Sequence, residues 1–148
     1  MSSPDDLLKA SERFYAALNC MLNGDPAPLS DIWLHGKTVT TMHPVGGRQV
    51  GWDSVWDSWV QVARHASAGQ VQLRDRLIEI AGDAAYELGV EHGQFKLAGQ
   101  QINIKSRVTN IYRRDEGGWK IVHHHTDPAS AMTGVGRSPG LISTGKVV

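Results

Sequence analysis

The stretch that most constrains the fold is residues 102–128, INIKSRVTNIYRRDEGGWKIVHHHTDP. Its two arms are rich in β-branched and aromatic residues, and they flank a polar turn, Asp-Glu-Gly-Gly, at residues 115–118. Strands favour such side chains, and a glycine pair supplies the backbone freedom that a tight turn needs. The pattern therefore predicts a long antiparallel hairpin.

Alternation along this hairpin predicts which side chains share a face. Side chains two residues apart point the same way, and directly opposed residues of an antiparallel pair share a face. We assume a register in which Arg113 faces Trp119, and this register places Arg107 opposite His125. One face then changes from apolar near the turn to polar at the far end. A one-residue slip would break this grouping.

Upstream, the sequence predicts helices first and then more strands. Apolar residues recur at helical spacing in residues 5–23 and again in residues 51–66, where three tryptophans lie on one stripe. Residues 37–43 alternate as a short strand, and residues 70–81 and 84–96 form a hairpin across Gly-Asp. This order predicts an α+β fold with an antiparallel meander.

Size and composition limit the functional classes. The chain of 148 residues suits one domain, residues 1–128, followed by a Gly/Ser-rich tail at 129–148. Fifteen basic residues balance fifteen acidic ones, which disfavours nucleic acid and anionic membranes as partners. The N-terminus is acidic, no apolar run approaches a membrane span, and Cys20 is the single cysteine. We expect a cytoplasmic protein.

One sheet face needs a cover beyond the two helices. The face carrying Val108, Tyr112 and Val122 is partly apolar, and we expect it to lie away from the helices. Exposed apolar surface of this kind marks an interface. The sequence therefore predicts a homodimer packed sheet to sheet, with His124 on this outer face.

The hairpin also carries a family resemblance. The stretch RVTNIYRRDEGGWKIVHHHTDP resembles the C-terminal hairpin of SnoaL-like domains in the nuclear transport factor 2-like superfamily. It is especially similar to the bacterial ketosteroid isomerase homologues and to the calcium/calmodulin-dependent kinase II association domain. Weaker similarity extends over residues 5–128. The resemblance implies a cone-shaped, curved antiparallel sheet around a long N-terminal helix (a cystatin-like fold), a dimer, and a pocket at the open end.

The polar end of the hairpin supplies the candidate site. His125 or His123 would be a general base, because histidine changes protonation near neutral pH, and Arg107 would stabilise a developing oxyanion. The expected substrate-binding residues are Trp56, Trp59, Thr109, His43 and Asp127. Glu91 is expected to form an ordinary ion pair with Arg107.

These residues predict a small-molecule pocket enzyme that acts on a small apolar or acidic substrate without a cofactor or metal. It would be an isomerase, cyclase or dehydratase. Resemblance to ketosteroid isomerases and scytalone-dehydratase-type enzymes favours this reading. The aspartate base and the Tyr–Asp oxyanion pair of ketosteroid isomerase have no matching positions here.

Three alternatives stay open. In the first, the pocket binds a ligand without chemistry, and Arg107 holds a carboxylate. In the second, the domain is an oligomerisation module like the kinase association domain. In the third, His123, His125 and Asp127 form a metal site, since two imidazoles and a carboxylate suit zinc or non-haem iron.

Overall fold

A computed structural model describes residues 3–129; all of the predicted tail except residue 129 lies outside this range. The helices are α1 (Pro4–Met21), α2 (Leu29–Ile32) and α3 (Trp52–His65). The strands are β1 (Thr40–Met42), β2 (Arg48–Val50), β3 (Ala66–Ala81), β4 (Ala84–Leu97), β5 (Gln100–Asp115) and β6 (Gly118–Pro128). They form one sheet in the order β2-β1-β6-β5-β4-β3.

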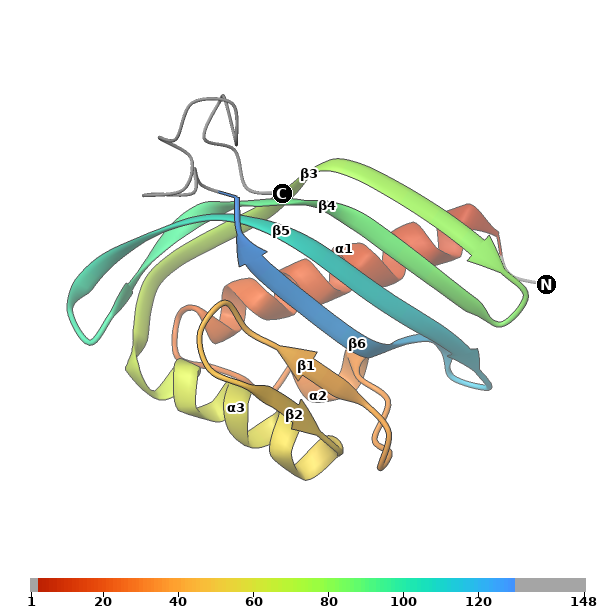
Figure 1. Cartoon of the computed structure of the whole chain (residues 1–148), viewed down its shortest axis with the longest axis horizontal. Coiled ribbons are helices and arrows are strands. Elements are labelled where there is room, and N and C mark those ends of the chain that lie inside the picture. The colour runs from red at the N-terminus through yellow and green to blue at the C-terminus, as the bar shows by residue number, and fades with distance from the viewer. Residues whose placement is uncertain (1–2, 130–148) are drawn as a thin grey trace, which may run out of the picture.

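The sheet curves around α1, as the sequence predicts (Figure 1). Neighbouring strands are antiparallel except β1 and β6, which run parallel. The long strands β3 to β6 bend over α1, and α3 packs beside the short pair β1–β2 near one end of the bowl (Figure 1). The α+β class and the curved antiparallel sheet around the N-terminal helix are confirmed.

Helix α1 starts and ends where its sequence signals lie. Ser3 is the N-cap: its Oγ accepts from the Asp6 backbone N–H, and the Asp6 carboxylate accepts from the Ser3 N–H, which makes a capping box. Beyond the last turn, Gly24 has a φ of 98°, a left-handed conformation that glycine adopts without strain. The apolar stripe of the helix, with Leu7 and Phe14 fully buried, faces the sheet.

The bend of the sheet depends on one close approach between strands. Gly93 on β4 faces the interior, and a Cβ added there would overlap the carbonyl oxygen of Gln70 on β3. Register shifts in β3, near positive-φ residues Ala68 and Asp75, turn this strand further over the helix. The close approach at Gly93 and the register shifts of β3 together give the sheet its curvature.

The register of the last hairpin differs from the prediction. Arg114, rather than Arg113, pairs with Trp119, because the turn has two residues and not five. A second shift follows: Tyr112 pairs with Ile121 but the preceding residue of β5 pairs with His123, which leaves Val122 as an extra residue. This is a β-bulge, and it reverses the alternation of β6 from that point on.

The bulge and the turn decide which side chains face α1. Tyr112, Asn110 and His124 are buried on the concave side, so the prediction that Tyr112 and His124 lie away from the helices is wrong. Arg107, opposite Asp127, points to the other side. Alternation shows which residues share a face, but it does not tell which face is covered.

Within residues 3–129, no helix combines the length and the hydropathy that crossing a lipid bilayer requires.

Candidate functional site

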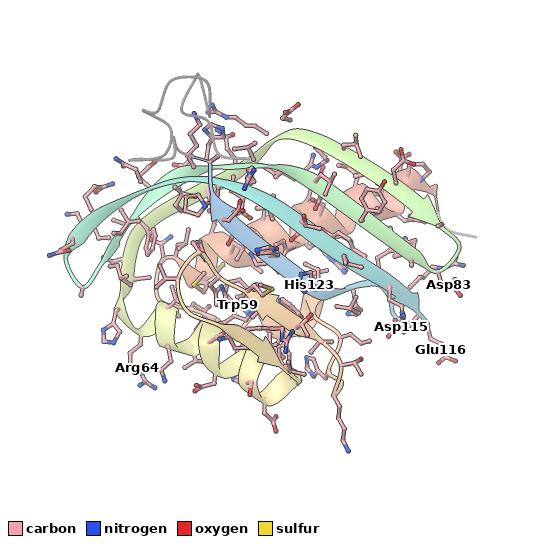
Figure 2. All side chains as sticks on the ribbon, viewed as in Figure 1. Trp59, Arg64, Asp83, Asp115, Glu116 and His123 are labelled. Carbon is pink, nitrogen blue, oxygen red and sulfur yellow. The ribbon has the colours of Figure 1, made fainter. Side chains whose placement is uncertain are left out.

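A cavity of about 450 Å³ opens between α1, α3 and the concave face of the sheet. Most of its walls are apolar, with Leu18, Val71 and Phe95 among the lining side chains. Trp59 of α3 lines this space, and Figure 2 shows it between α3 and the curved sheet. The volume suits a small organic molecule, and apolar walls with a few polar groups are the usual composition of such sites.

Glu91 is the acidic group of the cavity. It lies on the interior face of β4 between Gly89 and Gly93, with 6% of its surface exposed. Its Oε2 accepts a hydrogen bond from the Tyr15 hydroxyl at 2.9 Å. Burial raises the pKa of Glu91 from 4.5 to about 7, the nearby Glu87 adds to the rise, and the Tyr15 hydrogen bond opposes it. A carboxyl with this pKa exchanges protons readily near neutral pH.

Two histidines reach the same cavity. His124 on β6 is fully enclosed between Phe14 and Trp59, with ring centroids 5.3 and 5.5 Å away, and burial holds its pKa well below the usual value. His43, after β1, has its Nε2 2.9 Å from the Ser58 hydroxyl, and burial lowers its pKa to about 4. Both imidazoles are therefore neutral at pH 7.

Behind the cavity, Glu87 anchors a buried hydrogen-bond network. Its carboxylate accepts from Ser11 Oγ (2.6 Å), Arg76 Nε (3.0 Å), Asn110 Nδ2 (3.0 Å) and Tyr112 Oη (2.8 Å). Because each of the two carboxylate oxygens accepts two hydrogen bonds, the fully buried carboxylate is well satisfied. The network ties α1 to β3, β4 and β5 directly beneath the cavity.

Two of the predicted pocket residues line this cavity. Trp59 and His43 both do, and their rings lie 4.7 Å apart. Trp56 lies one turn earlier on α3, half-buried against Trp52 at 5.5 Å. It packs on the core and does not line the cavity.

The other predicted residues gather on the opposite face of the sheet. Arg107 and Asp127 form a bidentate pair there, at 2.8 and 2.6 Å, and this pair lowers the pKa of Asp127. Thr109 and His125 lie beside them along a shallow groove. The predicted pairing of Glu91 with Arg107 is wrong, because the two side chains lie on different faces and Glu91 is aligned with Ser106. A catalytic role for this face stays a prediction.

His123 also belongs to the outer face. Its Nδ1 lies 2.6 Å from the Thr40 hydroxyl, and its ring is 6.2 Å from that of His125. In the described part of the chain, no three His, Cys, Asp or Glu side chains converge on a position for a metal ion. The alternative metal set with Asp127 is therefore not assembled.

Sequence reasoning missed the residues that the cavity brings together. Glu91 and His124 were assigned to other roles, and Tyr15 was not singled out. One signal was present: Glu91 shares its strand face with Gly89 and Gly93, so a carboxylate lies between two residues without side chains. Such a position is recessed, and a recessed carboxyl is a candidate for an altered pKa.

Comparisons with known proteins agree with this architecture. Residues 8–130 match the family model described as the SnoaL-like domain. A candidate dehydratase of the nuclear transport factor 2-like family from Streptomyces avermitilis is 26% identical, with 86% of this chain and 96% of that chain covered and a TM-score of 0.76.

Two further structures share the fold. A nuclear transport factor 2-like superfamily protein from Salmonella enterica is 21% identical (90% and 95% covered, TM-score 0.76). A protein from Thiobacillus denitrificans, named as a candidate calcium/calmodulin-dependent kinase II association domain, is 22% identical (86% and 96% covered, TM-score 0.68). Among curated proteins, no significant match was found. The chain belongs to the SnoaL-like domain family and has the nuclear transport factor 2-like, or cystatin-like, fold.

Proposed function

We propose that the protein is an enzyme that moves a proton on a small neutral molecule, in an isomerisation, cyclisation or dehydration. The observation that carries this proposal is the buried carboxyl of Glu91, which faces an apolar cavity and has a pKa of about 7. A group with this pKa can take a proton and return it at the same pH, which general acid–base catalysis requires. The Streptomyces avermitilis relative, named as a candidate dehydratase, fits this class.

The charges of the cavity favour a neutral ligand over an acidic one. Glu91 would repel a carboxylate, and the cationic side chain among the lining residues of the cavity, Lys105, is exposed on its strand. Arg107, predicted as the anchor of an acidic ligand, lies on the other face and pairs with Asp127. An anion moved into the interior of this apolar space, beside Glu91, would lose its hydration and gain only the solvent-exposed counter-charge of Lys105.

In the proposed reaction, ionised Glu91 removes a proton from a carbon next to a carbonyl group. The electron pair of the broken C–H bond moves into the carbonyl to give an enolate. For an isomerisation, the substrate is a β,γ-unsaturated carbonyl compound and the anion is a dienolate: the Glu91 carboxylic acid returns the proton to the γ-carbon, the C=C bond moves to the α,β position and the carbonyl re-forms. Tyr15 holds the carboxyl in place, and Trp59 packs on the apolar body of the ligand.

Hydrogen exchange tests this step without knowledge of the natural substrate. The probe is 1-tetralone, a neutral bicyclic ketone, in D₂O, with loss of its α-proton signal followed by NMR. We expect the protein to accelerate exchange and Glu91→Gln to reduce that acceleration by about 10²–10⁴-fold. The matched control is Glu79→Gln, at an exposed position on β3. Acceleration that survives in Glu91→Gln, or tight binding of the probe without exchange, contradicts the catalytic role.

The same proposal includes a homodimer formed through the outer face of the sheet. Leu77, Tyr86 and Leu88 leave 48%, 44% and 37% of their surface exposed there. Light scattering after size exclusion should give a dimer, and Leu88→Glu should shift it to a monomer. Val50→Glu is the control, because Val50 is similarly exposed (51%) on a different strand, β2. A monomeric native protein contradicts the dimer, and a larger ring favours an assembly role.

A further inference from the structure

Asn110 lies at the centre of the buried network, and its contacts fix which way its amide points. Its Nδ2 donates to Glu87 Oε1 at 3.0 Å and to the Tyr15 hydroxyl oxygen at 3.2 Å. The Tyr15 proton is directed to Glu91, so the Tyr15 oxygen is free to accept. Both groups near Nδ2 are therefore acceptors, and an inverted amide would place an oxygen against them.

The other end of the amide then determines the state of His124. Asn110 Oδ1 lies 2.6 Å from His124 Nδ1, and an amide oxygen can only accept. Nδ1 must carry the hydrogen. A neutral imidazole has one N–H, so Nε2 has a bare lone pair. Among residues 3–129, no protein donor is within hydrogen-bond reach of this Nε2, and the ring lines the cavity.

We propose that Asn110 is a positioning residue that locks His124 as the Nδ1–H tautomer, so that the cavity presents a hydrogen-bond acceptor and selects ligands with a hydroxyl group. The chemical class is a neutral, mostly apolar carbonyl compound that also carries an alcohol or phenol hydroxyl group, or the enol of such a compound. This selectivity rests on the proposed function, because it assumes that the cavity is the ligand site. The tautomer itself does not depend on it.

A single amide thereby sets the hydrogen-bonding state of two polar groups of the cavity, Glu91 and His124. Asn110 Nδ2 donates to the Tyr15 oxygen, so the Tyr15 hydroxyl proton is directed to Glu91. Asn110 Oδ1 accepts from His124 Nδ1, so His124 Nε2 remains an acceptor. Glu87, four residues from Glu91 on β4, orients Asn110 in turn. The network beneath the cavity is thus an orienting device as well as a packing element.

The tautomer can be measured directly by NMR. Multiple-bond ¹H–¹⁵N correlation spectra distinguish a protonated ring nitrogen from a bare one. We expect His124 to be almost wholly Nδ1–H in the native protein, mixed in Asn110→Ala, and again Nδ1–H in Asn110→Asp, whose carboxylate restores the acceptor. Tyr112→Phe is the matched control, because it removes one donor to Glu87 and leaves the Asn110–His124 contact in place.

Two results would overturn the role of Asn110. One is an Nε2–H tautomer in the native protein, which needs no variant and therefore no concern about folding. The other is an unchanged tautomer in Asn110→Ala. A mixed tautomer in the Tyr112→Phe control would assign the effect to general loosening of the network and would equally contradict the proposal.

Selectivity is tested with a pair of probes that differ by one donor. These are 2-naphthol and 2-methoxynaphthalene, both neutral, titrated while the tryptophan fluorescence is followed. We expect 2-naphthol to bind about tenfold more tightly, because an unmet buried acceptor is costly, and Asn110→Ala to lose this preference. Equal affinities in the native protein overturn the selectivity. Unchanged ketone exchange in Glu91→Gln would instead overturn the proposed reaction and leave the tautomer result intact.

Discussion

The Tyr15 hydroxyl donates to Glu91 Oε2 across 2.9 Å, which links the middle of α1 to the interior face of β4. Burial, followed by the charge of Glu91, raises the pKa of Tyr15 well above its usual value, so the hydroxyl keeps its proton across the working pH range. It therefore remains a donor, whichever protonation state Glu91 adopts. The hydrogen bond favours the ionised carboxyl, and burial favours the neutral one.

Tyr15→Phe should raise the pKa of Glu91 further above about 7, because it removes the hydrogen bond that stabilises the carboxylate and leaves the burial unchanged. Titration of the ¹³C-labelled side-chain carboxyl by NMR measures this shift. Tyr86→Phe, at an exposed tyrosine on the same sheet, should leave the titration unchanged. A lowered or unaltered pKa in Tyr15→Phe would show that the hydroxyl does not support the anion.

Glu91 should make part of the stability depend on pH. Its folded pKa of about 7 exceeds the ordinary value of 4.5, so between these values the folded state binds more protons than the unfolded state. This contribution is fully present below pH 4.5 and is lost as pH rises through about 7. It amounts to about 3 kcal/mol.

Urea unfolding of native protein and Glu91→Gln at pH 4.5 and pH 8 isolates this contribution, since other groups titrate in both proteins. The glutamine variant should gain about 3 kcal/mol relative to the native protein over this range. A difference in unfolding free energy that stays constant with pH would contradict the raised pKa. The comparison with the variant is needed because the lowered pKa values of His43 and His124 make the stability rise with pH, whereas the raised pKa of Glu91 makes it fall.

His43 should make the protein sensitive to acid. Its folded pKa of about 4 lies below the ordinary value of 6.5, so the unfolded state binds more protons between these values. Stability from this group is present above pH 6.5 and is lost as pH falls toward 4. His43→Gln should therefore show a smaller loss of Tm between pH 7 and pH 4.5. His65→Gln is the control, because it lies at the exposed end of α3.

Glu87→Ala should lower the free energy of unfolding by about 3–5 kcal/mol. It removes the buried partner of a half-exposed ion pair with Arg76 and strands the donors of Ser11, Asn110 and Tyr112. Chemical denaturation measures the loss, and Glu79→Ala at the exposed position on β3 should cost little. A loss below 1 kcal/mol would mean that the network contributes orientation without stability.

Much of the fold follows from local sequence signals. The capping box at Ser3, the glycine after α1 and the tryptophan stripe of α3 each act over a few residues, and the elements start and end near them. Period-two alternation likewise predicts which hairpin residues share a face, as Arg107 and Thr109 do with His125. These signals are local because capping, turns and alternation depend on neighbours in the chain.

The candidate site is less predictable, because it depends on relationships between distant segments. Which face of the sheet α1 covers is decided by packing over the whole domain, and the composition of β5 allows either side. The extra residue at Val122 cannot be read from its own neighbourhood either, since it is defined by its lack of a partner on β5. Glu91 acquires its pKa from burial under α1, which no spacing within β4 reveals.

The bulge at Val122 has a consequence for the three successive histidines of β6. With it, one imidazole, that of His124, enters the cavity, and its two neighbours face outward. In a regular register without the bulge, Val122 would pair with Ile111, and His123 and His125 would fall opposite the inward-facing Asn110 and Val108, so that these two imidazoles would point inward. A shift of one residue in the pairing of β6 with β5, without any change of sequence, would thus convert a site with one imidazole into a site with two.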